Sequence, residues 1–166
     1  MEKERILILD QQHIDRKLQR MAYEIWEHNS NESGIVLIGI ESGGVAVAES
    51  LAARLAKISP LKVEMLSLKL NKKQPLQSPV EINANLSGRS VVLADDVANS
   101  GKTLLYALKP LLDQEPSKIM VAVLVDRKHK SFPVTPDIVG HSISTTLQDH
   151  IVVECNADGS MEAFLE

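Results

Sequence analysis

Residues 89–108 constrain the fold of this chain more than any other stretch, because they combine a strand, a turn and a helix. The run from 91 to 93 is apolar and rich in β-branched residues, which is typical of a strand covered on both faces. Asp95 and Asp96 follow this strand, and helical spacing of leucines begins at Lys102. Ligands bind outside the carboxyl ends of the strands in open parallel α/β sheets. The sequence therefore predicts a ligand site in this turn.

The rest of the chain alternates predicted strands and helices. Continuous apolar runs at residues 35–40 and 118–125 predict buried strands, and Asp10 is a suitable N-cap for an amphipathic helix. An alanine-rich helix is expected over residues 45–55. Further short strands are predicted at residues 6–9, 63–70, 80–82, 137–141, 150–154 and 161–165. This order favours an α/β fold, a doubly wound and mostly parallel sheet flanked by helices.

The chain has 166 residues, which is the length of one domain. We expect a single domain over residues 1–166, with a small hood built from the N-terminal segment and residues 126–166. A single cysteine, Cys155, excludes an internal disulfide framework and fits a reducing cytoplasm, and we expect it in the core. No apolar run approaches the length of a membrane span, so we expect a cytoplasmic protein without membrane partners.

The turn after Asp96 has the chemistry of a phosphate site. The first N–H groups of a helix have no intrahelical partner, and the helix dipole attracts an anion there. Ser100 and Thr103 add hydroxyl donors, and Gly101 allows close approach of the backbone. Asp95 and Asp96 can accept hydrogen bonds from vicinal hydroxyls or hold Mg²⁺, which prefers oxygen ligands. Phosphate, diol and divalent metal together describe a sugar phosphate.

The residues Gly101, Lys102 and Thr103 also suggest a nucleoside-triphosphate P-loop. That motif requires a glycine five residues before the GKT glycine. Asp96 occupies this position, and its carboxylate would repel a phosphate. The sequence therefore favours a sugar-phosphate site over a P-loop.

The sequence VVLADDVANSGKT, residues 91–103, resembles the phosphoribosyl-pyrophosphate (PRPP) binding motif of type I phosphoribosyltransferases. Residues 8–29, 35–56 and 121–145 are similar, in order and spacing, to the bacterial pyr-operon regulators that are also uracil phosphoribosyltransferases. The resemblance covers most of the chain. It implies transfer of ribose 5-phosphate from Mg²⁺-bound PRPP to a nucleobase, with release of pyrophosphate.

The resemblance also implies a role for each part of the site. Asp95 and Asp96 would serve the ribose hydroxyls and Mg²⁺, and are the catalytic residues expected. The 5′-phosphate would be held by the loop composed of Val97, Ala98, Asn99, Ser100, Gly101, Lys102 and Thr103. Pyrophosphate would meet Ser42, Gly43 and Gly44. A mobile loop over residues 69–79 would contribute Lys69, Lys72 and Lys73. The nucleobase pocket would be lined by Asp126, Arg127, His150, Ile151 and Val152.

Three positions depart from the family pattern. Glu41 and Gly43 stand where basic residues are common near the leaving pyrophosphate, and Asn99 replaces the acid of hypoxanthine-type enzymes. Uracil is therefore the expected base. A PRPP- or nucleotide-binding regulator with weak or no catalysis, and a purine phosphoribosyltransferase, are the alternatives.

A basic cluster at residues 127–130 is interpreted first as a solvated loop and second as a base or RNA contact. The net charge of −4 does not favour RNA as a partner. A homodimer or homotetramer is expected because the family usually assembles in this way.

Overall fold

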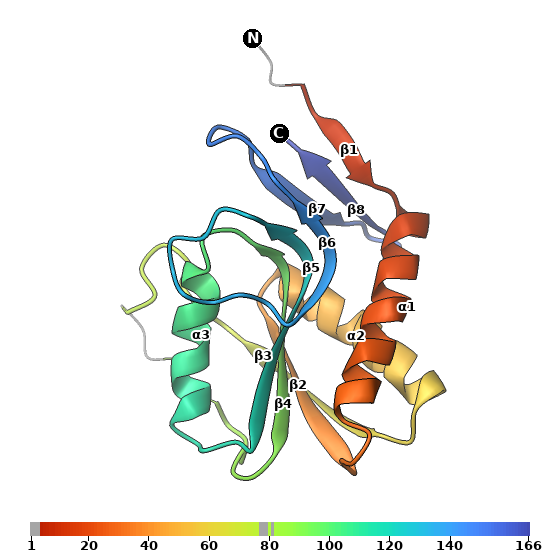
Figure 1. Ribbon diagram of the computed structural model, residues 1–166, viewed down its shortest axis with the longest axis vertical. Helices are drawn as coiled ribbons and strands as arrows, with labels where there is room; N and C mark the ends of the chain where they lie inside the picture. Colours follow the sequence, from red (N-terminus) through yellow and green to blue (C-terminus); the bar gives the residue numbers. More distant parts are fainter. Residues whose placement is uncertain (1–3, 77–79, 81) are drawn as a thin grey trace.

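The core of the protein is a five-stranded parallel sheet in a computed structural model that describes residues 4–76, 80 and 82–166 (Figure 1). The strand order is β3-β2-β4-β5-β6, so the chain builds outward from the centre in both directions. The strands are β2 (Gly34–Ile40), β3 (Lys62–Leu68), β4 (Ser90–Ala98), β5 (Lys118–Arg127) and β6 (Ile138–Ile143). This arrangement confirms the predicted doubly wound α/β fold.

Helices cover both faces of the sheet, which is why its central strands are continuously apolar. Helices α1 (Gln11–His28) and α2 (Gly43–Ile58) lie on one face, and α3 (Lys102–Leu112) lies on the other (Figure 1). The predicted N-cap of α1 is confirmed, because the Asp10 side chain accepts a hydrogen bond from the His13 N–H at 2.9 Å. Each face buries its own hydrophobic cluster.

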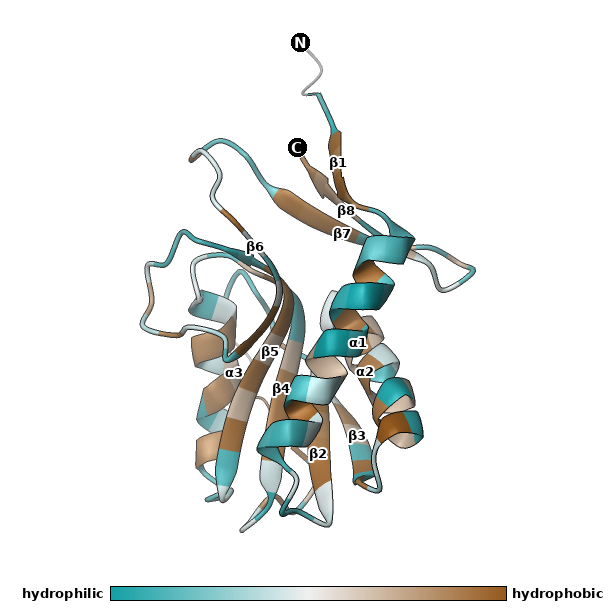
Figure 2. Cartoon of the chain, turned by 45° about the vertical axis from the view of Figure 1, so that its right-hand side comes forward, coloured by the Kyte–Doolittle hydropathy of each residue, from teal (hydrophilic) through white to brown (hydrophobic). Residues whose placement is uncertain are grey.

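A second, three-stranded antiparallel sheet forms the hood. Its strands are β1 (Ile6–Leu9), β7 (Ile151–Cys155) and β8 (Met161–Leu165), in the order β1-β8-β7. Their apolar segments, brown in Figure 2, stand above the end of α1 and join the core cluster of α1 and α2 through Leu9, Ile151 and Ala163. Strand β6 belongs to the main sheet, so the hood sheet is smaller than the stretch 126–166.

Several element boundaries differ from those predicted. Strand β4 continues past residue 94 to Ala98, because Asp95 and Val97 pair with Val123 and Val125 of β5. Asp95 and Asp96 therefore lie inside the strand rather than after it, and Asp126 and Arg127 lie in β5 rather than in a loop.

Two further boundaries differ in the segments that follow β2 and β3. Helix α2 begins at Gly43, two residues earlier than predicted. The predicted strand at 80–82 is absent at Val80 and Ile82, and its middle residue lies outside the described part. No helix of the described residues is both long and apolar enough to cross a membrane.

Candidate functional site

A small pocket lies where β4 ends and α3 begins. Its volume is about 90 Å³. It is lined by Lys72, Asp95, Val97, Ala98, Asn99, Ser100, Gly101, Lys102, Thr103 and Leu104. Gly101 caps the helix in the left-handed region, with φ of 87°, which glycine adopts without steric cost. The structure thus brings the predicted phosphate-binding residues together around one concave surface at the N-terminus of a helix.

The two carboxylates beside this pocket differ in environment. Asp95 is 1% exposed, and its Oδ1 accepts the Asp96 N–H at 2.9 Å and lies 3.9 Å from the Lys72 Nζ. Burial and the charge of Asp96 raise the pKa of Asp95 well above its usual value, against the opposing effect of Lys72. Asp96 is only partly buried. Asp95 is therefore a carboxylate whose negative charge the fold accommodates poorly without a cationic partner.

The turn at Ser42, Gly43 and Gly44, whose two glycines begin α2, lies directly against these carboxylates. A Cβ placed on Gly43 would lie 1.9 Å from Asp96 Oδ2, and one on Gly44 would lie 2.6 Å from the Ala94 carbonyl oxygen. The peptide bond between Glu41 and Ser42 is cis. The predicted pyrophosphate turn and the predicted ribose carboxylates are therefore in contact, although more than fifty residues separate them in the sequence.

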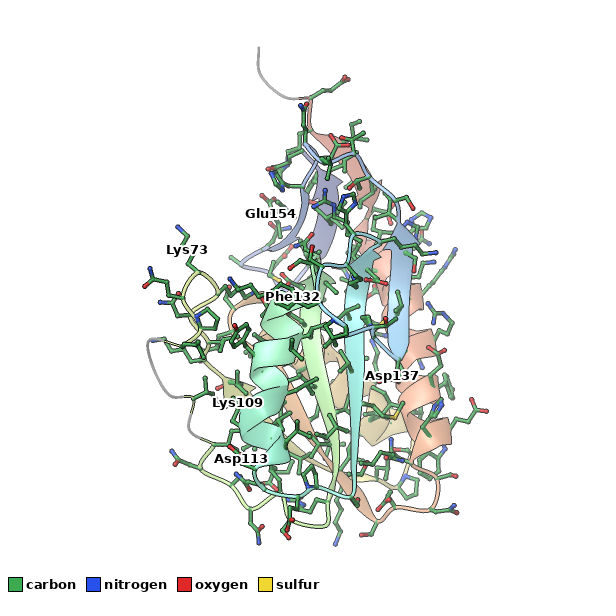
Figure 3. The ribbon with its side chains drawn as sticks, turned by 60° about the vertical axis from the view of Figure 1, so that its left-hand side comes forward. Lys73, Lys109, Asp113, Phe132, Asp137 and Glu154 are labelled. Carbon is green, nitrogen blue, oxygen red and sulfur yellow. The ribbon has the colours of Figure 1, made fainter. Side chains whose placement is uncertain are left out.

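The loop after β3 contributes one cation to the site. Lys69, Lys72 and Lys73 are all exposed, and Lys72 is the one that approaches Asp95. Lys73 stands away from the body of the protein, at the outer side of the loop (Figure 3). Residues 77–79 of the predicted mobile loop lie outside the described residues.

Asp126 and Arg127 are buried at the end of β5, beside the loop. The Cα register places Asp126 next to Ala98 at the end of β4. Arg127 donates from Nε to Thr145 Oγ1 at 2.5 Å and from a terminal nitrogen to the Thr146 carbonyl at 2.7 Å. Arg127 therefore fixes the chain after β6 and is not the solvated residue expected.

The three hood residues predicted to bind the base differ in how deeply they are buried. Ile151 belongs to the hydrophobic core, and Val152 is partly buried on the opposite side of β7, because neighbouring residues of a strand alternate. His150 is exposed, and its backbone exchanges two hydrogen bonds with Glu166. Cys155, expected in the core, is exposed at the end of β7. Partial burial and the charge of Asp96 raise the pKa of its thiol.

One residue in contact with the loop was not predicted as a site residue. Lys130 Nζ donates to the carbonyl oxygen of Asn99 at 3.0 Å, to Asp126 Oδ1 at 2.5 Å and to the carbonyl oxygen of Arg127 at 2.9 Å. The sequence contains one signal for the contact between Lys130 and Asp126, which is that the two residues have opposite charges and lie four positions apart.

The family profile of the phosphoribosyl transferase domain matches residues 7–158, a range that includes every residue predicted for this site and ends before β8. The chain belongs to the phosphoribosyltransferase family. Two relatives of this phosphoribosyltransferase are named Bifunctional protein PyrR. The one from Geobacter sp. (strain M21) is 39% identical over 92% of each chain. The one from Halalkalibacterium halodurans is 34% identical over 96% of each chain.

Solved structures show that the phosphoribosyltransferase shares its fold with purine enzymes. A hypoxanthine phosphoribosyltransferase of Trypanosoma cruzi superposes with a TM-score of 0.77 at 17% identity, over 84% of this chain and 82% of that one. A hypoxanthine-guanine phosphoribosyltransferase of Bacillus anthracis superposes with a TM-score of 0.75 at 18% identity, over 96% of each chain. At these identities the likeness establishes the type I fold alone.

The left-handed backbone of Gly101 gives a direct test of the loop. We expect Gly101→Ala to cost about 1–2 kcal/mol in the free energy of unfolding, because a Cβ is strained at this φ. The same Cβ would lie 3.2 Å from the Phe132 carbonyl oxygen, so the loop must also shift and its affinity for a phosphate should fall. Denaturant unfolding and titration with ribose 5-phosphate measure the two effects. Gly88→Ala is the control, because Gly88 also has a positive φ but has no neighbour near its Cβ position.

Proposed function

We propose that this phosphoribosyltransferase transfers ribose 5-phosphate from PRPP to uracil and releases pyrophosphate. The observation that supports this most is the meeting of three groups at the carboxyl ends of β2 and β4. These groups are the two adjacent carboxylates, the loop at the start of α3 and the glycine turn that contacts the carboxylates. A ribose ring, a 5′-phosphate and a pyrophosphate present the matching chemistry in the same order.

Asp95 and Asp96 would bind the two ribose hydroxyls, since carboxylates accept hydrogen bonds from a diol in pairs. Their oxygens also suit Mg²⁺, and the described residues provide no group of three acidic, histidine or cysteine ligands. Two carboxylates fit this ion because Mg²⁺ usually keeps several waters and binds substrate oxygens as well. When bound, the ion would neutralise charge on the pyrophosphate. A cation beside Asp95 would also relieve the burial of its charge.

The loop from Val97 to Thr103 would hold the 5′-phosphate with backbone N–H and hydroxyl groups. The turn from Ser42 to Gly44 would meet the pyrophosphate, whose charge the bound ion would neutralise beside the carboxylates. The base nitrogen would attack the anomeric carbon while the bond to pyrophosphate breaks, and positive charge would develop at that carbon. The loop carrying Lys69, Lys72 and Lys73 would exclude water and add positive charge near the leaving group.

The base would bind between the end of β5 and the hood. Asp126 and Arg127 mark the β5 side, and Val152 offers an apolar side chain on the face of β7 opposite Ile151. His150 lies at the start of the same strand. Uracil is preferred because Asn99 lacks the carboxylate expected of a hypoxanthine enzyme. Assembly as a homodimer or homotetramer belongs to the same proposal.

A PRPP-binding regulator with weak catalysis is the second candidate, and one observation favours it. The turn at 42–44 carries no cation, and a side chain on Gly43 would collide with Asp96. A basic residue could not be accommodated there without moving that carboxylate. With Glu41 and Gly43 at these positions, two positive charges that would stabilise the leaving pyrophosphate are missing, while the residues proposed to bind the sugar phosphate are all present.

The two candidates are separated by incubating the protein with Mg²⁺, PRPP and one base at a time. We expect pyrophosphate release with uracil, and at least tenfold less with hypoxanthine, guanine or xanthine, since a base with the wrong polar edge leaves buried groups unpaired. PRPP binding by calorimetry is measured in parallel. Binding without release for any base contradicts transferase activity and supports the regulator, and a faster reaction with a purine contradicts the assignment of uracil.

A further inference from the structure

The segment formed by Lys130, Ser131 and Phe132 is hydrogen-bonded to the loop from Val97 to Thr103, called the phosphate loop below. The carbonyl oxygen of Ser100 accepts from the N–H groups of Ser131 at 2.9 Å and Phe132 at 3.0 Å. The carbonyl oxygen of Asn99 accepts from Lys130 Nζ at 3.0 Å. Figure 3 shows Phe132 near one end of α3, the opposite end from Asp113. The carbonyl groups of Asn99 and Ser100 are therefore turned toward residues 130–132.

This contact decides where the N–H groups of the loop point. In a trans peptide the C=O and N–H bonds point in opposite directions. Because the carbonyl groups of Asn99 and Ser100 face residues 130–132, the N–H groups of Ser100 and Gly101 face the other side. Ser100 and Gly101 line the pocket at the start of α3, whose lining includes none of residues 130–132. The pocket is therefore on the side away from these three residues.

Lys130 joins two parts of the site through one ammonium group. Its other two hydrogen bonds go to the Asp126 carboxylate and the Arg127 carbonyl, both at the end of β5. Asp126 is buried, so the carboxylate that holds Lys130 is itself fixed by the sheet. An ammonium group has three donors, and all three are used. Lys130 is therefore neither a solvated lysine nor a free cation for a nucleic-acid phosphate.

We propose that Lys130, with the backbone of Ser131 and Phe132, is a positioning clamp that orients the N–H groups of Ser100 and Gly101 toward the 5′-phosphate. This role rests on the proposed function, because it requires a ribose 5-phosphate at the loop. Lys130 acts through the Asn99 peptide and does not touch the substrate. Its link to Asp126 also holds the phosphate loop at a fixed position relative to the base side of the site.

The test compares Lys130→Met with Lys128→Met, which removes an exposed neighbouring lysine from the same segment. Calorimetry measures the affinity for ribose 5-phosphate and, separately, for Mg²⁺-pyrophosphate. We expect Lys130→Met to bind ribose 5-phosphate about tenfold more weakly, because a charge-assisted hydrogen bond that orients the loop is lost. Pyrophosphate affinity should stay unchanged, since the turn at 42–44 does not contact the clamp. Lys128→Met should leave both affinities unchanged, and Lys130→Arg should restore part of the ribose 5-phosphate affinity.

Steady-state kinetics gives a second readout. We expect the KM for PRPP to rise about tenfold in Lys130→Met while kcat falls much less, because an interaction with a non-reacting phosphate is made in ground and transition states alike. A folded Lys130→Met protein with unchanged affinity for ribose 5-phosphate overturns the clamp. Equal loss for both ligands also overturns it, because that result indicates a general structural role.

If Lys130→Met shows no cooperative unfolding transition, Ser131→Pro and Ser131→Ala decide the matter. Proline removes the N–H that donates to Ser100, and alanine keeps it. The clamp requires ribose 5-phosphate affinity to fall with proline and not with alanine. If the parent protein binds ribose 5-phosphate but releases no pyrophosphate from PRPP with any base, the proposed reaction is refuted. The clamp proposal is unaffected by that result.

Discussion

Asp95→Asn is expected to weaken PRPP binding strongly while making the ligand-free protein more stable at neutral pH. Asparagine has the shape of aspartate and keeps the oxygen that accepts the Asp96 N–H. It removes a charge that is 1% exposed and that the fold solvates poorly. It also removes a carboxylate that would bind the ribose hydroxyls and Mg²⁺. We expect PRPP affinity to fall about 100-fold or more, as when a charged hydrogen-bonding group is lost from a buried site.

The stability gained by Asp95→Asn relative to the parent protein should increase as the pH rises. Burial raises the pKa of Asp95 in the folded protein above its usual value of 3.8. Below that value the carboxyl group is neutral in both the folded and the unfolded chain, and the substitution has no electrostatic effect. The folded protein loses stability relative to the variant as the pH rises from there through the raised pKa. Thermal unfolding in EDTA from pH 3.5 to 8 measures the difference between the two proteins.

Asp113→Asn is the control for this comparison, because Asp113 is exposed at the end of α3. It should change neither stability nor PRPP affinity. If Asp95→Asn is less stable than the parent at pH 8, the burial of an unfavourable charge is contradicted. If it retains PRPP affinity, the assignment of the ribose site to Asp95 is wrong.

Gly44→Ala is expected to lower both stability and activity, because the new methyl group has nowhere to go. Its Cβ would lie 2.6 Å from the Ala94 carbonyl oxygen and 3.0 Å from the Asp95 Cα, both of which are backbone atoms of β4. Helix α2 would have to move away from the sheet at its first turn. Overpacking of this kind costs about 1–3 kcal/mol. The same movement would separate the turn at 42–44 from the carboxylates, so pyrophosphate release should become undetectable.

Gly34→Ala is a matched control at the opposite end of β2. A Cβ on Gly34 would lie 2.7 Å from the Lys62 carbonyl oxygen, which is a backbone clash of the same size. We expect a comparable loss in urea unfolding, but unchanged affinity of the folded protein for Mg²⁺-pyrophosphate. Equal loss of pyrophosphate affinity in both variants would indicate that general destabilisation, and not the turn, is responsible.

The parts of the fold that the sequence predicted depend on local patterns. The apolar runs that became β2, β4 and β5 are continuous because helices cover both faces of the sheet. The clustering of residues 97–103 around one pocket could be predicted because acids, hydroxyls and a glycine occur within one short segment. These signals need no knowledge of distant residues.

The parts that were missed depend on contacts between distant segments. Pairing with Val123 and Val125 of β5 extends β4 through Asp95 to Ala98. Residues 95–98 themselves carry no sequence signal that predicts this extension. The glycine turn reaches the carboxylates only after β2 and β4 have paired. Lys130 lies in a basic cluster that the sequence predicts to be solvated. Its three hydrogen-bond partners, the Asn99 carbonyl, the Asp126 carboxylate and the Arg127 carbonyl, are known only from the structure. The exposure of Cys155 likewise depends on where β7 ends.

The pairing of β1 with β8 has a consequence for the order in which the protein can fold during synthesis. The Met161 N–H bonds to the Gln11 side chain across 150 positions, and β1 finds its partner strand only beyond that point. The five-stranded sheet and the loop at the start of α3 can form before β8 leaves the ribosome. Until β8 is synthesised, β1 has no partner strand and remains an unpaired apolar edge that includes Ile6 and Leu7. The nascent chain should therefore acquire the proposed sugar-phosphate surface before the proposed base pocket, which is completed only when β1 and β8 pair.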